Sequence, residues 1–286
     1  MSTPPPRISV VVPALNESKL VRGAIESATR FDGATETQKD ARPGQTVEVI
    51  VVDGGSTDDT ALEAKRAGAV VLASARGRAT QCNVGANVAT GDVLLFLHAD
   101  STLPPTFKTD VCAHFAERGE CKSSAEWGAF KFRLGDSGVL SMSSSTRFCF
   151  RLIELLANLR TSLFRCPYGD QCIIVRKETF DELGGFPQMP FLEDYELVRR
   201  LRRRSTPALM KSFVTTSARR WHALGLLKTT AVNQFVLLGY TVGVPLEVLA
   251  RWYAAGRQMG GGSESTEKNT KRDRAVHESI NDIKRS

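Results

Sequence analysis

Three acidic motifs place residues that can do chemistry where strands or helices of the chain should end or begin. In the first, Asp53 follows an apolar run and precedes two glycines, in "VIVVDGGSTDDT". A carboxylate there can accept hydrogen bonds from a base N–H or from ribose hydroxyls, because glycine lets a ligand approach the backbone closely. The alternative is a plain strand–turn–helix connection, in which Asp58 only caps the helix.

The second motif is "VLLFLHAD", an apolar run that ends at His98 and Asp100. An aspartate at the end of a buried strand can hold a divalent cation, which would neutralise a diphosphate. The alternative is an aspartate that only caps a turn or a helix.

The third motif is the pair Glu193 and Asp194, in the first turn of a helix predicted over 192–204. Such a carboxylate can act as a general base on a hydroxyl. The helix dipole favours its ionised form, whereas burial raises its pKa, and the sequence leaves the balance open. The two acids can also serve helix stability alone.

The elements that must position these motifs alternate between strand and helix. β-Branched apolar runs predict strands at 8–13, 47–52, 69–74 and 92–100, and amphipathic segments between them predict helices at 16–28 (with Asn16 as N-cap), 59–68 and 77–91. This alternation predicts a parallel sheet covered on both faces, which binds ligands at the carboxyl ends of its strands. "PALNE", "DGGSTD" and "HAD" all fall there. Farther on, a strand at 126–134 and a long helix at 140–160 are expected.

Composition narrows the class of protein. The chain has 286 residues, 42% of them hydrophobic and 24% charged, which is typical of a globular protein. The net charge of +7 favours a phosphate-bearing partner. The sequence shows no basic stripe interleaved with aromatic residues, which is the pattern typical of nucleic-acid-binding proteins. The six cysteines show no metal-binding spacing, which favours reduced thiols in an intracellular protein.

No signal peptide is predicted, and the apolar stretch 235–250 is shorter than the ~20 residues that a spanning helix needs. We therefore expect a cytoplasmic protein, with membrane-peripheral contact through residues 223–256 left open. No G-x-G-x-x-G motif follows the first strand, which argues against a nicotinamide-dependent enzyme. "PALNE" at that position is also poorly suited to cradle a triphosphate, as a nucleotidyltransferase would.

Several motifs in order resemble the family 2 glycosyltransferases of the GT-A fold. They are "VVVPALNE", "VIVVDGGSTDDT", "GRATQCNVGANVATGDVLLFLHAD", "GGF" and "FLEDYELVRRL", and the resemblance extends over about residues 7–222. "HADSTLP", "WGAF", "PYGDQ", "GGFP", "LEDYEL" and "TSARRW" further resemble a subgroup identified with arsenosugar biosynthesis.

The resemblance implies an α/β GT-A fold: a Rossmann-like, mostly parallel central sheet flanked by helices, with a C-terminal helical segment. The expected organisation is a disordered N-terminus at 1–6, the glycosyltransferase domain at 7–222, C-terminal helices at 223–258 and a disordered tail at 259–286. Within the domain, residues 7–100 would form the nucleotide-binding half and residues 125–222 the acceptor-binding half.

The resemblance also implies roles for individual residues. Asp194 would be the general base and Glu193 its neighbour. The nucleotide sugar would be bound by Pro13, Asn16, Glu17, Asp53, Arg78, Asp100, Arg220 and Trp221. From the residues themselves, Tyr168, Asp170 and Gln171 are expected to bind the acceptor, and Trp127 is either a stacking platform for a sugar or a core residue. Asp100 would hold the metal, with His222 and His98 as further candidate ligands.

Two departures from the family pattern bear on function. His98 stands where the family has the first acid of Asp-x-Asp, and "ARRWHALG" lacks the glutamine of the Gln-x-x-Arg-Trp motif of processive members. We therefore expect an inverting, non-processive hexosyltransferase that uses Mn²⁺ or Mg²⁺, a UDP- or GDP-sugar and a small-molecule or lipid acceptor. The alternatives are a catalytically inactive nucleotide-sugar-binding protein of the same fold and a nucleotidyltransferase.

Overall fold

The computed structural model describes residues 5–30, 47–116, 125–135, 144–219 and 226–258. These residues belong to two compact units. The first is formed by residues 1–135, 141–189 and 193–216, and the second by residues 136–140, 190–192 and 217–286. The units are described separately below.

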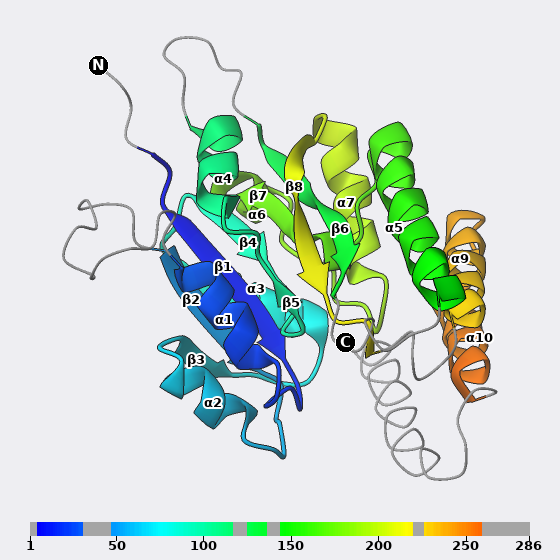
Figure 1. The fold of residues 1–286 in the computed structure, drawn as a ribbon, viewed down its shortest axis with the longest axis horizontal. Coiled ribbons are helices and arrows are strands. Elements are labelled where there is room, and N and C mark those ends of the chain that lie inside the picture. The colour runs from blue at the N-terminus through cyan, green and yellow to red at the C-terminus, as the bar shows by residue number, and fades with distance from the viewer. Residues whose placement is uncertain (1–4, 31–46, 117–124, 136–143, 220–225, 259–286) are drawn as a thin grey trace. The chain divides into compact units, whose positions relative to one another are not determined.

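The first unit is built on one eight-stranded sheet (Figure 1). Its strands, in chain order, are β1 (Ile8–Ala14), β2 (Val47–Asp53), β3 (Val70–Ala73), β4 (Val93–Phe96), β5 (Ser101–Thr102), β6 (Trp127–Leu134), β7 (Ile173–Arg176) and β8 (Ala208–Thr216). They lie side by side in the order β3-β2-β1-β4-β7-β6-β8-β5. The α/β fold with a helix-flanked sheet that the sequence predicts is confirmed.

The sheet is parallel from β3 to β4, and β7 runs antiparallel to both of its neighbours. In the parallel part Ala14 is paired with Asp53, and Val11 with Phe96. The carboxyl ends of β1, β2 and β4 therefore meet at one edge, where such sheets bind ligands.

Helices cover both faces of this sheet (Figure 1). Side chains alternate between the faces of a strand, so Val10 and Val12 of β1 pack into one core and Val11 into the other. The first core includes residues of α1 (Val21–Thr29), α2 (Thr60–Arg66) and α4 (Phe107–Phe115), and the second includes residues of α3 (Arg78–Val88), α6 (Lys177–Glu182) and α7 (Glu193–Arg204).

The long helix α5 (Ser144–Phe164) packs against β6 through polar side chains that bind its backbone. Asn158 accepts a hydrogen bond from the Phe132 N–H at 2.8 Å and donates one to the Phe132 carbonyl at 2.9 Å. Glu154 accepts from the Leu134 N–H at 2.7 Å. These bonds fix which face of α5 is turned to the sheet. A short 3₁₀ turn, η2 (Gly169–Gln171), follows α5.

The second unit contains α9 (Leu226–Thr241) and α10 (Leu246–Gln258), so the predicted C-terminal helical segment is confirmed. Phe235 of α9 packs against Trp252 of α10 with ring centroids 5.0 Å apart. No helix in the described ranges combines the length and apolarity that crossing a membrane requires. The predicted tail at 259–286 and most of the predicted disordered N-terminus lie outside the described residues.

The helix predicted to start at Asn16 begins instead at Val21, so Asn16 as its N-cap is wrong. Asn16 has a positive φ of 55°, and its side-chain oxygen accepts from the Thr57 N–H at 2.8 Å. The Asn16 N–H in turn donates to the Ser56 hydroxyl at 2.8 Å. The residues after β1 are thus tied to the turn after β2, which local sequence signals for helix capping do not reveal.

Candidate active site

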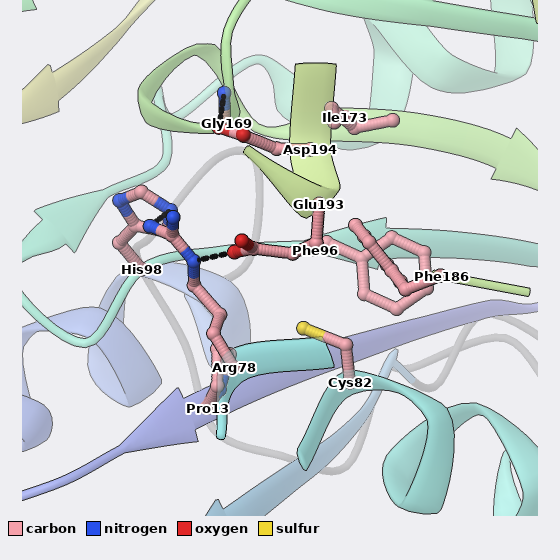
Figure 2. A pocket seen from close by; sticks show the side chains of 10 residues that line it. All are labelled: Pro13, Arg78, Cys82, Phe96, His98, Gly169, Ile173, Phe186, Glu193 and Asp194. Carbon is pink, nitrogen blue, oxygen red and sulfur yellow. Dashed lines mark hydrogen bonds and ion pairs between the residues drawn. The ribbon is translucent and has the colours of Figure 1, made fainter. Parts of the chain in front are cut away.

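A pocket opens in the first unit among β1, β4, α3, η2 and the start of α7 (Figure 2). It is lined by Pro13, Arg78, Cys82, Phe96, His98, Gly169, Ile173, Phe186, Glu193 and Asp194. Five of the predicted site residues meet here: Pro13, Arg78, His98, Glu193 and Asp194. The pocket walls are otherwise mostly apolar.

Arg78 is the centre of charge in this pocket. Its Nε donates to Glu193, whose side chain is only 2% exposed, and its Nη1 lies 3.4 Å from His98 Nε2. Figure 2 shows the guanidinium between the His98 ring and the Glu193 carboxylate. Burial lowers the pKa of Arg78, but the adjacent carboxylates of Glu193 and Asp194 raise it more, so Arg78 remains a cation.

Asp194 is held by two backbone amides. One carboxylate oxygen accepts from the Gly169 N–H at 2.9 Å, and the other accepts from the Tyr195 N–H at 2.8 Å. Burial raises the pKa of Asp194, but the Arg78 charge and these two hydrogen bonds outweigh it, and the net pKa is lowered. The balance that the sequence left open therefore favours an ionised carboxylate.

Gly169 leaves room for this arrangement. A Cβ at this position would lie 2.7 Å from Asp194 Oδ2 and 3.1 Å from His98 Nε2. Both side chains therefore pack directly against the Gly169 backbone. A glycine in η2 lets Asp194 and His98 approach each other from α7 and from the end of β4.

The predicted nucleotide edge is a pair of loops held together by side chains. Asp53 is 9% exposed and accepts from the Ser56 N–H at 3.0 Å and the Gly55 N–H at 3.2 Å, which closes the turn after β2. Gly55 has a φ of 85°, a conformation that suits glycine. Glu17, in the loop after β1, donates its N–H to the Thr60 hydroxyl at 2.8 Å. Asp53 therefore shapes the turn, and its part in nucleotide binding stays a prediction.

Gln81 is a site residue that the sequence did not single out. Its buried side-chain amide donates 2.8 Å hydrogen bonds to the carbonyls of Ala14 and Val52, at the ends of two neighbouring strands. A Cβ on Gly54 would lie 3.0 Å from this side chain, so Gly54 makes room for it. The only sign of this role in the sequence is a glutamine on the buried face of the predicted helix. Its hydrogen-bond partners are distant in the sequence, so the sequence does not identify them.

Cys82 also lines the pocket and was not predicted to do so. Burial raises the pKa of its thiol, and the nearby Arg78 only partly opposes this. Cys82 is therefore a protonated wall residue and not a nucleophile.

Asp100 follows β4, is half-buried, and accepts a hydrogen bond from the Ser101 hydroxyl at 3.4 Å. No group of three or more His, Cys, Asp and Glu side chains within the described ranges could hold a metal ion. Mg²⁺, however, is commonly held by one or two carboxylates together with substrate phosphates. Asp100 fits that mode, as a protein ligand to an ion shared with a diphosphate.

His98 receives no support as a metal ligand. Its Nε2 faces the Arg78 guanidinium at 3.4 Å, and a metal ion at that nitrogen would be repelled by the neighbouring positive charge. The structure instead groups His98 with Arg78 and Asp194.

Two predicted acceptor residues are structural. Trp127 is fully buried and its indole N–H donates to the Ser205 carbonyl at 3.0 Å, so a role as sugar-stacking platform is wrong and the core reading is right. Gln171 is also fully buried, accepts from the Thr161 hydroxyl at 2.8 Å and donates to the Phe130 carbonyl at 3.1 Å. Its side chain serves the fold and does not reach an acceptor.

Tyr168 and Asp170 flank Gly169 and are partly exposed, so acceptor binding by them stays a prediction. The guanidinium of Arg160 stacks on the Tyr168 ring, 3.3 Å from its centroid. Arg220, Trp221 and His222 lie outside the described residues.

The fold is similar to that of solved glycosyltransferases. A mannosyltransferase from Pyrobaculum calidifontis, solved in complex with GDP-Man and Mn²⁺, matches with a TM-score of 0.54 and 19% sequence identity. The match covers 82% of this chain and 64% of that one. At this level of identity the similarity establishes the fold.

Sequence relatives carry names of the same class. A PGL/p-HBAD biosynthesis glycosyltransferase of Mycobacterium tuberculosis is 27% identical over 240 residues, which cover 80% of this chain and 82% of that protein. A glucosyl-3-phosphoglycerate synthase of the same species is 32% identical over 109 residues, covering 34% of this chain and only 30% of the relative. This second match therefore spans less than a third of the relative's length.

The N-terminal part of the chain matches a family model directly. That model, glycosyl transferase family 2, covers residues 9–125, which include all of β1 but its first residue, the whole of β2 to β5, and the strand-end motifs "PALNE", "DGGSTD" and "HAD". The match supports the resemblance inferred from those motifs over residues 9–125. Residues 9–125 of this chain, somewhat less than half of its 286 residues, are therefore similar to the glycosyl transferase family 2.

Proposed function

We propose that the chain is an inverting glycosyltransferase that moves a hexose from a UDP- or GDP-sugar to an acceptor hydroxyl. One observation carries the proposal: an ionised carboxylate, Asp194, faces a pocket beside the carboxyl ends of β1 and β4, two strands that lie in the part of the chain similar to the glycosyl transferase family 2 model. The names of the sequence relatives support the reaction class.

Asp194 acts as the general base. It accepts the proton of the acceptor hydroxyl as the hydroxyl oxygen attacks the anomeric carbon. The new glycosidic bond forms on the face opposite the bond to the diphosphate, which breaks and leaves its electron pair on the phosphate oxygen. A single displacement of this kind inverts the anomeric configuration. The amides of Gly169 and Tyr195 hold the carboxylate in position.

Arg78 and Asp100 serve the leaving group. The Arg78 cation, held in the pocket by Glu193, favours the negative charge that develops on the departing diphosphate. Asp100 would hold a divalent cation, Mn²⁺ or Mg²⁺, that supplies further charge neutralisation at the diphosphate. Pro13, Asn16, Glu17 and Asp53 would border the nucleoside, with Arg220 and Trp221 near the diphosphate and acceptor and His222 as a further metal ligand.

The acceptor is a small molecule or a lipid, approached by Tyr168 and Asp170, and a single sugar is transferred at each encounter. The resemblance to the arsenosugar subgroup predicts an acceptor or donor from arsenosugar synthesis. We place the protein in the cytoplasm, with residues 223–256 in contact with a membrane surface. The exposed side chains of Phe235, Leu238 and Val242 support that contact.

A donor screen tests the proposal. The full chain is incubated with UDP- and GDP-sugars, with Mn²⁺, with Mg²⁺ or with EDTA, while thermal unfolding and nucleotide release are recorded. We expect one nucleotide sugar to raise the unfolding temperature, because a ligand that binds only the folded protein stabilises it. That sugar should also be slowly hydrolysed or transferred, with release of the nucleoside diphosphate and dependence on the metal.

Other outcomes would contradict the proposal in distinct ways. Binding without turnover, with all acceptors tested, would indicate an inactive nucleotide-sugar-binding protein. Release of pyrophosphate from a nucleoside triphosphate and a sugar phosphate would indicate a nucleotidyltransferase. An arsenic-bearing acceptor in the same assay tests the narrower subgroup prediction.

A further inference from the structure

The outward face of α5 is covered with large apolar side chains. Seven of them are between 42% and 67% exposed: Phe148, Leu152, Leu155, Leu156, Leu159, Leu163 and Phe164. Half of the exposed large apolar side chains among the described residues therefore lie on this one helix. Contiguous apolar surface of this kind marks an interaction site more often than scattered single residues do.

The spacing of these residues places them in one stripe. Phe148, Leu152, Leu155, Leu159 and Leu163 follow each other at intervals of three or four residues, which is the repeat of an α-helix. The stripe runs along most of a helix about 30 Å long. It is a continuous surface and not a set of separate contacts.

The opposite face of α5 is bound to the sheet, so the stripe cannot turn inward. Asn158 and Glu154 hydrogen-bond to the backbone of β6, and Phe150 and Thr161 are buried. Rotating the helix to hide the leucines would break these hydrogen bonds and expose the buried face. The outward orientation of the stripe is therefore built into the fold.

The charges that accompany the stripe are all positive. Arg147, Arg151 and Arg165 are exposed, at both ends and along the side of the helix. Glu154, the only acidic residue of α5, faces β6 and accepts a hydrogen bond from the Leu134 backbone. The exposed surface of α5 thus combines apolar and cationic side chains.

We propose that the outward face of α5 lies on an anionic lipid surface, with its axis parallel to the membrane. Leucine and phenylalanine side chains would enter the region between headgroups and acyl chains, while the arginines lie at the lipid phosphates. A second copy of the chain fits this surface less well, because a symmetric pair of α5 helices would bring arginines together. The site belongs to the first unit and is distinct from the contact proposed for residues 223–256.

The inference stands apart from the reaction proposed above, since it uses no residue of the pocket. Its test measures lipid binding and not sugar transfer. A negative result for lipid binding would therefore leave the proposed sugar transfer untouched, and a negative result for sugar transfer would leave the lipid contact untouched.

The experiment is vesicle flotation of the full chain, with phosphatidylcholine alone and with phosphatidylcholine containing phosphatidylglycerol. The test variant is Leu155→Glu with Leu159→Glu, and the matched control is Leu62→Glu on α2, where the wild-type leucine is 44% exposed. We expect wild type and control to float with anionic vesicles, and the α5 variant to bind at least about tenfold more weakly. A second variant, Arg151→Gln with Arg165→Gln, should weaken binding mainly at low salt. Circular dichroism and thermal unfolding check that each variant is folded.

Three outcomes would overturn the proposal. The first is wild-type protein that does not bind anionic vesicles. The second is binding that survives the α5 substitutions but is lost in Phe235→Glu with Leu238→Glu, which would assign lipid contact to the C-terminal helices alone. The third is a wild-type dimer, seen by light scattering, that the α5 substitutions convert to a monomer without any effect on lipid binding.

Discussion

Arg78 of α3 and Glu193 of α7 form an ion pair inside the pocket although 115 positions separate them in the sequence. The pair joins the helix that follows β3 to the first residue of α7, next to the proposed base Asp194. The Glu193 side chain is 2% exposed and the Arg78 side chain 38% exposed. Leaving the Glu193 charge unpaired therefore costs more free energy than leaving the Arg78 charge unpaired, because water can still reach Arg78.

Glu193→Gln should destabilise the fold. A fully buried pair that loses one partner costs about 3–5 kcal/mol, and we expect about 2 kcal/mol here because water still reaches part of Arg78. Urea unfolding followed by circular dichroism measures the change. The matched control, Asp181→Asn, breaks the surface pair with Lys177 and should cost less than about 1 kcal/mol. Equal effects in the two variants would contradict the prediction.

Asp194→Asn should slow transfer strongly while leaving the fold and donor binding in place. The asparagine oxygen can still accept from the Gly169 N–H, but the amide cannot take a proton, so kcat should fall by about 10²–10⁴. Donor affinity, measured by calorimetry, should change little. Transfer at a rate close to that of the wild type would contradict the assignment of Asp194 as general base. Asp181→Asn, a substitution at the surface, is again the control.

The pH dependence should reflect the ionised state of Asp194. Since its pKa lies below the ordinary value, the acid limb of kcat/KM should fall below pH ~4 in the wild type. Burial raises the pKa of Asp194, and the Arg78 charge is the largest influence that lowers it, so Arg78→Gln should move the limb to higher pH. A pH–rate profile of the two proteins tests this, and an unmoved limb would contradict it.

The same lowered pKa has a consequence for stability. Ionised Asp194 stabilises the folded state above the unfolded pKa of about 4, and that contribution is lost as the pH falls through the lower folded value. Asp194→Asn should therefore flatten the dependence of the unfolding free energy on pH below about 4. Denaturant titrations at several acidic pH values would show whether the slope changes.

Gly169→Ala should disturb the base more than the fold. The added Cβ would lie 2.7 Å from Asp194 Oδ2, so the carboxylate must move, and a shift of this size should lower kcat by about 10²-fold. Gly23→Ala in α1 is the matched control, because its Cβ would meet only Thr102 at 4.0 Å. That control should keep full activity and gain up to about 1 kcal/mol of stability. Similar activity in the two variants would show that Asp194 tolerates displacement.

Gln81→Leu should weaken the nucleotide edge. It removes the side-chain hydrogen bonds to the carbonyls of Ala14 and Val52, of which the Ala14 carbonyl keeps the bond from the Gly54 N–H at 3.0 Å. Each lost hydrogen bond should cost about 0.5–1.5 kcal/mol. Donor affinity should fall together with stability, because the loops after β1 and β2 lose a common support. Gln188→Leu is the control: it removes one hydrogen bond at an exposed position, from the Thr80 hydroxyl at 3.0 Å, and should change both quantities much less.

The sequence was informative wherever a local pattern decides the structure. Continuous β-branched runs predicted β1 and β2 to within one residue of their observed bounds, because burial on both faces requires such runs. The strand predicted at 92–100 is shorter in the structure and ends at Phe96. The start of α1 was wrong because Asn16 bonds to Thr57 and not to the first turn of a helix. That partner comes from the next strand–helix connection, and no local signal contains it.

The site residues also divide into those that a local motif indicates and those that depend on partners distant in the sequence. Asp194 and Arg78 were predicted from motifs that resemble a family, and the structure places both in one pocket. Trp127 and Gln171 were misassigned because side-chain type does not tell whether a residue faces a ligand or the core. Gln81 was missed because its partners are backbone carbonyls at the ends of two strands, which leave no trace in residue type.

One feature of α3 limits how the chain can change. Arg78 and Gln81 lie three residues apart, so they sit almost one turn from each other on the same rigid helix. A single residue inserted between them would rotate Gln81 by about 100° relative to Arg78. The contacts to the strand ends and to Glu193 could then no longer form together. Between these two positions the chain should therefore not accept changes in length.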